Sequence, residues 1–197
     1  MEKSWRLWAK EYEINDWAFS SAFAWEKAVE ENPTSFNLFR LADSLRMCGN
    51  FIKSEEVFGR IEIDAVPMQH RYKYHSAKGK LFEDQGKMKE AILEYARSIE
   101  VGTPYTYSYV YLGASLAQKS EFSAAIDILN QALLKEGDLD EVYYNLGTTY
   151  ARLGDFEKAI ESMQKCLELD PKFPNAQDFL NDFKNLKNIQ GFQGESI

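Results

Sequence analysis

The chain contains few of the residues on which disulfide frameworks and metal sites depend. It has 197 residues but only two cysteines and two histidines. Cys48 and Cys166 lie far apart and lack the spacing of metal ligands, so neither a disulfide-bridged secreted scaffold nor a zinc module has a basis in the sequence. We interpret both cysteines as small buried residues of an apolar core.

Long hydrophobic runs are also missing. No window approaches the run of about 20 apolar residues that spans a bilayer. Acids and bases interrupt the first residues, MEKSWRLWAKEYEIND, where a signal peptide needs an apolar stretch of about 7–15 residues. We therefore expect no membrane insertion and no export signal, and by default a cytoplasmic location.

Basic residues are in the minority. The chain has 23 Lys and Arg but 31 Asp and Glu. The resulting net charge of −8 repels the phosphate backbone of a nucleic acid unless the basic residues gather on one face of the protein. Nucleic acid is therefore not an expected partner. Apolar residues make up 45% of the chain and aromatic residues 14%, which is enough to bury a core and predicts a folded domain.

What the chain does have is a period of 34 residues. Three glycines are each 34 residues from the next, and an alanine follows each of them after twelve residues. The residues are Gly79, Gly113 and Gly147 with Ala91, Ala125 and Ala159. Apolar residues recur around them at helical spacing, which predicts two helices in each unit. In the last unit Gly154 is expected to end the first helix and Asp155 to cap the second.

These features resemble the tetratricopeptide repeat (TPR) family, whose 34-residue helix-turn-helix unit has a W-x2-L-G-x2-Y core, a later Ala and a closing Pro. The last repeat carries most of the signature, in Tyr143, Leu146, Gly147, Tyr150, Ala159 and Pro171. The resemblance covers about residues 2–188. It implies an all-α fold, a right-handed α-solenoid of antiparallel helix pairs.

The register of the repeats predicts the organisation of the chain. Five repeats span about residues 2–34, 35–71, 72–105, 106–139 and 140–173. A capping helix at 174–188 completes a single domain, 1–188, and residues 189–197 are expected to form a disordered tail. In the second repeat the frame slips by three residues, and the insertion DAVPMQHRY around Pro67 predicts a longer loop there.

A few residues depart from the family pattern. They are Ser54 in place of the usual Ala, His75 and Lys78 at apolar positions, and Gly137 where Pro would close a repeat.

No catalytic residue, metal ligand or cofactor site is predicted. Gly86 and Lys87 lack the other residues of a phosphate loop. Ser162 and Lys165 match an S-x-x-K string but lie within a predicted helix and lack the accompanying motifs. His70 and His75 are five residues apart, a separation that does not align two ligands on one helical face.

In the TPR family the first helices of successive repeats line a concave groove that binds the partner. Carried over to this chain, the groove positions are Lys3, Arg6, Lys10, Glu13, Arg40, Asp43, Arg46, Lys73, Lys80, Glu83, Asp84, Tyr107, Tyr111, Ala114, Glu141, Tyr144, Asn145, Thr148 and Arg152. Eight of them are basic and five acidic, so this face opposes the sign of the whole chain. Such a face would attract acidic segments.

The resemblance therefore implies a non-catalytic module that binds an acidic or aromatic peptide or protein segment in the groove. The residues expected to bind it are Arg6, Lys10, Arg40, Lys73, Lys80, Tyr107, Tyr111, Tyr144 and Asn145. Tyrosine offers a large contact area and a hydroxyl, and Asn can bond a peptide amide. Two alternatives stay open: the charges form an ordinary solvated helix face, or the tyrosines pack between repeats.

One TPR subfamily clamps the C-terminal carboxylates of cytosolic heat-shock chaperones with Lys, Asn, Asn, Lys and Arg. This chain has Arg6, Lys10, Arg40, Lys73 and Ala77 at those positions. The positive charge is kept but the pattern is not, which favours an acidic ligand and argues against that particular tail.

Other functions remain as alternatives. Small acidic TPR proteins resemble the chaperones of bacterial secretion systems, which bind one dedicated client and often dimerise through their N-terminal repeats. The first repeat, with four tryptophans before Pro33, would then be an interface of a homodimer. An enzyme or an RNA-reading helical repeat would need a polar pocket or a basic surface that the sequence does not indicate.

Overall fold

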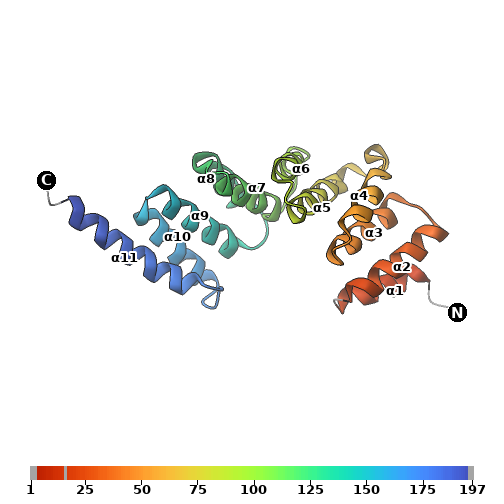
Figure 1. Cartoon of the computed structure of the whole chain (residues 1–197), viewed down its shortest axis with the longest axis horizontal. Coiled ribbons are helices and arrows are strands. Elements are labelled where there is room, and N and C mark those ends of the chain that lie inside the picture. The colour runs from red at the N-terminus through yellow and green to blue at the C-terminus, as the bar shows by residue number, and fades with distance from the viewer. Residues whose placement is uncertain (1–3, 16, 195–197) are drawn as a thin grey trace. The chain divides into compact units, whose positions relative to one another are not determined.

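The computed structural model describes residues 4–15 and 17–194, with side chains as far as Ile189. Its regular elements are helices, and one isolated bridge joins Tyr105 and Glu136. Figure 1 shows the chain as a succession of helix pairs. The predicted fold class, all-α with antiparallel helix pairs, is confirmed.

The chain forms two compact units, residues 1–102 and 103–197, and the single domain that the sequence predicts stays a prediction. The first unit contains α1 (Trp5–Ile14), α2 (Ala18–Glu31), α3 (Ser35–Met47), α4 (Phe51–Gly59), the 3-10 turns η1 (Ile63–Ala65) and η2 (Met68–His70), α5 (Arg71–Asp84) and α6 (Met88–Glu100). The second unit contains α7 (Tyr107–Gln118), α8 (Phe122–Ala132), α9 (Leu139–Leu153), α10 (Phe156–Leu169) and α11 (Ala176–Gly194).

The boundary between the units follows from backbone conformation and hydrogen bonding. Gly102 follows α6 with φ of 86°, a left-handed conformation that favours glycine. The segment after it is bonded within the second unit: the Thr106 amide donates to the Glu136 carbonyl at 2.9 Å, and the Glu136 amide donates to Pro104 at 3.0 Å. Gly137, with φ of 128°, lies against Thr106, so glycine here replaces the family's proline for a conformational reason.

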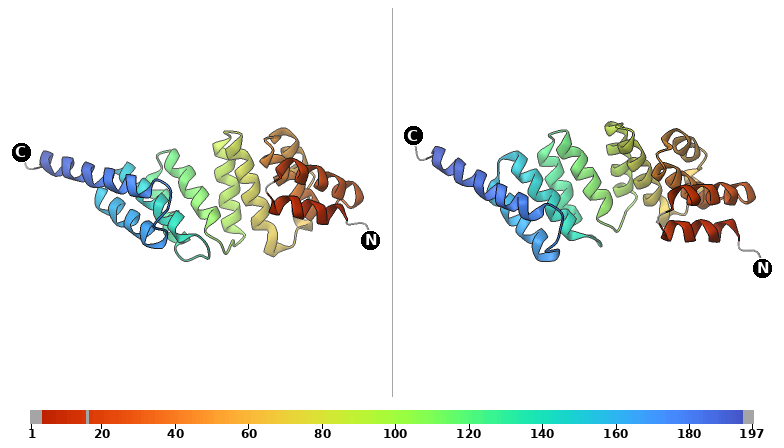
Figure 2. Two further views of the ribbon diagram at one scale, coloured as in Figure 1. Left: turned by 90° about the horizontal axis from the view of Figure 1, so that it is seen from below. Right: turned by 60° about the horizontal axis from the view of Figure 1, so that its bottom comes forward.

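The 34-residue period is the period of closest approach between the two helices of a pair. A Cβ atom added to Gly79 would lie 2.7 Å from the Tyr95 ring, and one added to Gly113 would lie 2.6 Å from Leu129. A Cβ atom added to Gly147 would lie 3.0 Å from the Met163 side chain. The alanines Ala91, Ala125 and Ala159 are fully buried. Figure 2 shows the paired helices α5 and α6 side by side.

The predicted turn of the last repeat is confirmed. Gly154 follows α9 in the left-handed conformation, with φ of 87°. Asp155 precedes α10, and its side chain accepts a hydrogen bond from the Lys158 amide at 3.2 Å. The carboxylate thereby satisfies one of the amides that have no partner within the helix.

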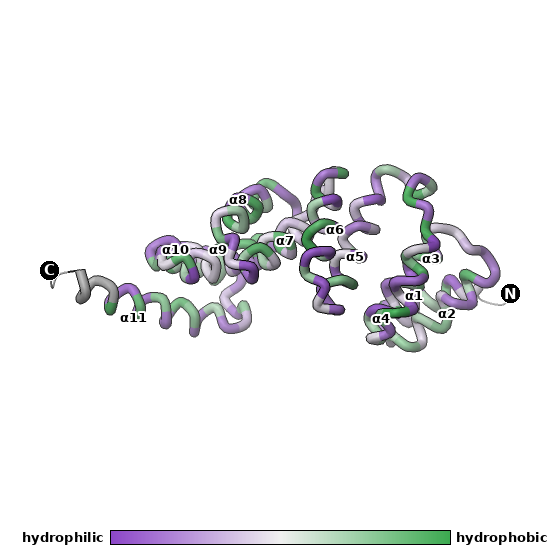
Figure 3. The backbone as a smooth tube through the Cα atoms, turned by 45° about the horizontal axis from the view of Figure 1, so that its top comes forward, coloured by the Kyte–Doolittle hydropathy of each residue, from purple (hydrophilic) through white to green (hydrophobic). Residues whose placement is uncertain are grey.

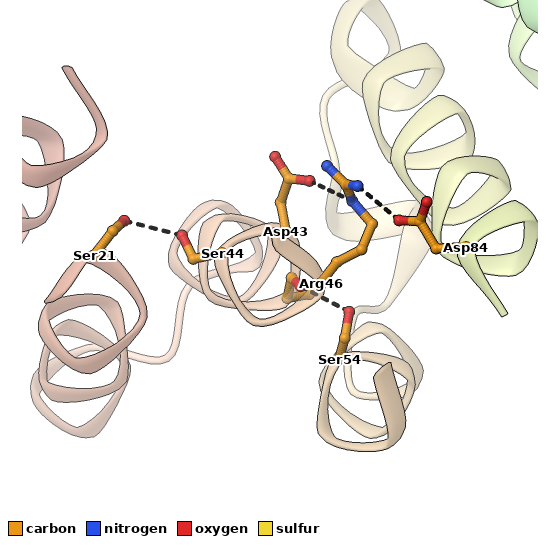
Figure 4. Close-up of polar contacts among 7 residues, drawn as sticks. Ser21, Asp43, Ser44, Arg46, Ser54 and Asp84 are labelled. Carbon is orange, nitrogen blue, oxygen red and sulfur yellow. Dashed lines mark hydrogen bonds and ion pairs between the residues drawn. The ribbon is translucent and has the colours of Figure 1, made fainter. Parts of the chain in front are cut away.

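Serines at tight positions of the first unit find buried partners. Ser54, which replaces the family's alanine, is fully buried, and its hydroxyl donates to the Ala42 carbonyl at 2.7 Å. Ser21 and Ser44 are hydrogen-bonded to each other at 3.0 Å between α2 and α3 (Figure 4). The hydroxyls are therefore tolerated in the core because each one is paired.

The polar residues at apolar positions of α5 are explained by a buried carboxylate on α6. Glu94 is 3% exposed. Its carboxylate contacts His75 Nδ1 at 2.8 Å, Arg97 at 2.8 Å and Lys78 Nζ at 3.5 Å. Burial alone would raise the pKa of Glu94, but the hydrogen bond to His75 and the charges of Lys78 and Arg97 outweigh it and lower that pKa.

Helix α11 covers the last repeat, as predicted. Ala176, Leu180 and Phe183 are buried against Met163 and Cys166 of α10. Figure 3 shows hydrophobic and hydrophilic residues alternating along α11. The helix continues to Gly194, so 189–194 is helical where the sequence predicted a disordered tail, and the remaining residues of that tail lie outside the described part of the chain. Gly191 weakens a helix by only about 1 kcal/mol, so the helix already begun at Ala176 can continue past it.

The two cysteines are free. Cys166 is fully buried as predicted, and burial, together with the charges of Asp140 and Asp170, raises the pKa of its thiol to about 11. Cys48 is only half-buried, and burial raises the pKa of its thiol as well. Both thiols are therefore protonated at neutral pH and poor nucleophiles.

Candidate functional site

A pocket of about 330 Å³ lies within the first unit, between α1, α3, the inserted segment and α5. We call it the first-unit pocket. It is lined by Arg6, Ser35, Phe36, Phe39, Ile61, Val66, Pro67, His70, Lys73 and Tyr74. Most of this lining is apolar or aromatic, and the polar groups are few, as is usual for ligand sites.

The inserted segment forms one wall of the pocket. The three-residue slip in the repeat becomes the turns η1 and η2, with Val66 and Pro67 between them. Arg71 holds this segment: its side chain donates to the Val66 carbonyl at 3.1 Å and to the Asp64 carbonyl at 3.3 Å. The longer connection that the sequence predicted is present as residues 60–70, between α4 and α5. It forms an ordered wall because the Arg71 guanidinium binds carbonyls that the turns leave without a partner.

The pocket is electropositive. The Arg6 guanidinium lies 4.7 Å from the centroid of the Phe36 ring. Neither Arg6 nor Lys73 forms an ion pair with a carboxylate in the described part of the chain. None of the described lining residues is acidic. Ser35 and Phe36 begin α3, and Lys73 lies in the first turn of α5, so the positive ends of two helix dipoles add to these side chains. The arrangement favours an anionic group.

Two other arginines of the predicted groove are already paired. Arg40 forms an ion pair with Glu13 of α1, and its Nε donates to the same carboxylate at 3.0 Å. Arg46 bridges Asp43 at 3.1 Å and Asp84 at 2.8 Å, joining α3 to α5 (Figure 4). These side chains hold neighbouring helices together, so their charge is largely neutralised by the chain itself.

The remaining basic residues of the predicted site differ in exposure. Lys10 is exposed on α1 but does not line the first-unit pocket. Lys80 is half-buried on α5. Lys3, which belongs to the predicted groove, lies outside the described residues. Of the five basic residues expected to bind a ligand, the structure therefore brings Arg6 and Lys73 together in one pocket.

The predicted aromatic residues lie in the second unit and largely pack there. The Tyr144 ring packs 4.8 Å from Phe173 and 5.9 Å from Phe179, centroid to centroid. Burial, with a smaller effect of Cys166, raises the pKa of Tyr144. The rings of Tyr107 and Tyr105 stack at 5.9 Å. Tyr144 therefore packs against rings at and after the end of the last repeat, and Tyr107 stacks on a ring two residues before it.

Two further residues of the predicted site are also part of the second unit. Tyr111 is half-buried on α7. Asn145 donates from its side-chain amide to the Glu141 carbonyl at 2.8 Å, within its own helix. That donor is used internally, which reduces what Asn145 can offer to a peptide backbone.

The described residues do not assemble the chemistry of an active site. Lys165 pairs with Glu168 at 2.7 Å on the surface, while Ser162 is buried on α10, so the S-x-x-K string is not a catalytic pair. His75 is bonded to Glu94 and His70 lines the pocket. Within the described ranges no group of three His, Cys, Asp or Glu is arranged to hold a metal ion. Nor is any helix there long and apolar enough to cross a lipid bilayer.

Comparison with known proteins identifies one repeat and the fold. Residues 140–173 match the model of the tetratricopeptide repeat. The chain is similar to a TPR protein with an unusual peptide-binding site, YrrB, with a TM-score of 0.67, 17% identity and coverage of 86% of this chain and 87% of that one. Residues 140–173 therefore form a tetratricopeptide repeat, and the fold of the chain is similar to that of TPR proteins.

Two other TPR-related similarities extend the comparison. Over 93 residues, 45% of the chain, it is 32% identical to the photosystem I assembly protein Ycf3 of Rippkaea orientalis, covering half of that protein. The first TPR domain of Spaghetti, solved with the HSP90 peptide SRMEEVD, aligns with a TM-score of 0.56 and 22% identity over 61% of this chain and 94% of that one. The first curated relatives are covered over only a tenth to a half of their own length.

The first-unit pocket contains residues that reasoning from the TPR sequence pattern missed. Val66, Pro67 and His70 belong to the insertion and have no counterpart in the repeat signature. The only sequence signal for them was the slip in register. Phe36 and Phe39 lie on α3 near Arg40, and the repeat signature alone does not distinguish them from residues of the core.

Proposed function

We propose that this TPR protein is a non-catalytic binding module that holds an acidic segment of a partner protein at the first-unit pocket, through Arg6 and Lys73. The observation that carries the proposal is the pocket's charge. Two cations that form no ion pair with any described residue and two helix N-termini meet there, in a chain whose net charge is −8. Anionic groups gain from both sources of positive potential.

The relatives support a binding role of this kind. YrrB is described as having a peptide-binding site, and the TPR domain of Spaghetti was solved with a peptide that contains two consecutive glutamates. Lys10, Lys80 and Arg40 are assigned lesser roles here: the first two would add to the attraction of an acidic segment at longer range, and Arg40 would orient α3 through Glu13. The cytoplasmic location stays a prediction of the sequence.

A random-peptide library displayed on phage and selected on the immobilised full chain tests the proposal. We expect the selected peptides to be enriched in Asp and Glu, and their binding to weaken as salt is raised from about 50 mM to 500 mM, because screening shortens the reach of the pocket's field. The Lys73→Glu variant should lose the enrichment. The matched control is Lys172→Glu, which changes the total charge equally but is exposed in the second unit, outside the pocket, and should keep the enrichment. Selected peptides without acidic residues would refute the proposal.

A second function is favoured by one observation in the first repeat. Large apolar side chains of α2 and the residue before it are exposed: Trp17 is 57% exposed, Phe19 77% and Phe23 52%. A dedicated chaperone or a dimerising regulator would use such a surface, and one relative, Ycf3, is an assembly protein. Analytical ultracentrifugation of the wild type and of Trp17→Ala separates the two functions: a dimer that the substitution dissociates supports the second, and a monomer at all concentrations rejects it.

A further inference from the structure

The aromatic lining of the first-unit pocket is held in place by the core beneath it. Fully buried Phe58 lies edge-on to Phe39, with ring centroids 6.4 Å apart, and edge-on to Tyr74 at 5.7 Å. Phe36 is 44% exposed, and its ring lies 5.8 Å from the ring of buried Trp25. Rings fixed in this way form a preorganised surface, so an incoming group does not have to order them.

The wall opposite is equally fixed. Val66 and Pro67 line the pocket and belong to the inserted segment that Arg71 ties down through two backbone carbonyls. Ile61, at the start of the same segment, is 7% exposed and anchors it to the core. A repeat of regular length would be three residues shorter here, so the wall formed by Val66 and Pro67 depends on this chain's insertion.

We infer that the first-unit pocket takes one large apolar side chain of the bound segment, preferably an aromatic ring, with a carboxylate beside it, and that Val66 and Pro67 of the insertion set this preference. This inference rests on the proposed function and specifies which kind of side chain of the bound segment the pocket recognises. The volume of about 330 Å³ is at the small end of the range of about 300–1,000 Å³ for ligand pockets, which suits a single side chain with its adjoining backbone. Arg6 and Lys73, at the same pocket, would meet the flanking carboxylate.

This assignment differs from the one that the sequence alone suggested. There the apolar part of the ligand was given to Tyr107, Tyr111 and Tyr144, and the first three repeats supplied only charge. The structure assembles aromatic surface and positive charge within the first unit, around Phe36, Phe39 and Tyr74. Both parts of the ligand can therefore be recognised without the second unit.

The test uses two fluorescein-labelled peptides, GEEFEEG-amide and GEEAEEG-amide, and the full chain in a fluorescence polarisation titration. We expect the phenylalanine peptide to bind at least about tenfold more tightly than the alanine peptide, since a well-packed aromatic anchor is worth that much or more. Two variants should reduce the ratio of the affinities for the two peptides to about one. Val66→Phe fills the pocket, and Phe36→Ala removes one of its aromatic walls. The alanine peptide should bind all these proteins alike.

Leu134→Ala is the control for Phe36→Ala, because Leu134 is an exposed apolar residue of the second unit, outside the pocket, and its truncation should leave the ratio of affinities unchanged. Circular dichroism melting shows whether each variant is folded. A ratio near one in the wild type, or a tenfold ratio that survives both pocket variants, overturns the inference. A third peptide, GQQFQQG-amide, tests the proposed function separately: if it binds as well as the glutamate peptide, or if no peptide binds up to about 1 mM, acidic recognition itself is wrong.

Discussion

Single residues decide how closely the helices of a pair can approach. Gly113 has no side chain, and buried Leu129 of α8 occupies the space where its Cβ would lie, at 2.6 Å. Gly59, by contrast, lies in α4 with nothing within 4 Å of an added Cβ. The same residue type is therefore required at one site and incidental at the other.

We predict that Gly113→Ala destabilises the protein by about 1–3 kcal/mol, because the new methyl group overpacks a closed core site. Gly59→Ala should change stability by less than about 1 kcal/mol, since alanine fits the space and favours the helix. Urea denaturation followed by circular dichroism measures both variants. Equal stability of the two variants would show that the helices can separate without cost.

Glu94 gives the first unit a dependence on pH. Its pKa is held below the ordinary value of 4.5 by the hydrogen bond to His75 and the charges of Lys78 and Arg97. A group with a lowered folded-state pKa stabilises the protein above its unfolded pKa, and this contribution is lost as the pH falls through the folded value. His75, Lys78 and Arg97 are the charged or titratable groups in contact with it.

We predict that Glu94→Gln destabilises the protein at pH 7 by about 3 kcal/mol or more, because three basic groups lose the buried charge that pairs with them. The difference in stability between the variant and the wild type should become smaller as the pH is lowered from 5 to 3. Glu168→Gln, which removes the surface pair with Lys165, is the control and should cost less than about 1 kcal/mol at every pH. Thermal melting over this pH range supplies the measurement, and a gap that does not depend on pH would contradict the assignment.

At the level of elements, α11 acts as the cover of the last helix pair. Its buried residues Ala176, Leu180 and Phe183 pack on α10, and the half-buried Phe179 packs near Tyr144. A repeat buries its apolar face only against a neighbour, so the element at the end of the array must supply that surface.

We predict that truncation after Phe173 lowers the melting temperature and causes aggregation, because Met163, Cys166 and Tyr144 lose their cover. Truncation after Ile189 should leave both properties unchanged, since the contacts of α11 with the apolar cluster end at Phe183. Differential scanning fluorimetry and light scattering compare the two truncated proteins with the full-length chain. A stable, monomeric protein that ends at Phe173 would show that α11 is dispensable.

At the level of the whole molecule, the chain consists of two compact units. In repeat proteins each helix pair contacts its neighbours and little else, so a local change affects stability locally. The boundary at Gly102 and the hydrogen bonds that tie Thr106 to Glu136 mark where one unit ends and the next begins.

We predict that Gly147→Ala speeds amide hydrogen exchange in α9, α10 and α11 and leaves α2 and α3 unchanged, because the Cβ would press on Met163 and the Ala159 carbonyl inside the second unit. Glu94→Gln should instead speed amide hydrogen exchange in α5 and α6 and leave the helices of the second unit unchanged. Hydrogen exchange with mass spectrometry resolves these peptides. Equal acceleration throughout the chain in either variant would show that the two units unfold as one.

The sequence by itself determined the repeat, its helix pairs and its capping helix. Glycine is needed wherever the two helices of a pair touch, so Gly79, Gly113 and Gly147 recur with the period of the repeat. The sequence also indicated the turn at Gly154 and Asp155, whose conformation and capping are local. Only the tertiary structure decided which cations remain unpaired, since Arg40 and Arg46 meet carboxylates of other helices at distances that no spacing in the chain encodes. The wall formed by Val66 and Pro67 was likewise decided in three dimensions, because a three-residue slip has many conformations and Arg71 selects one of them.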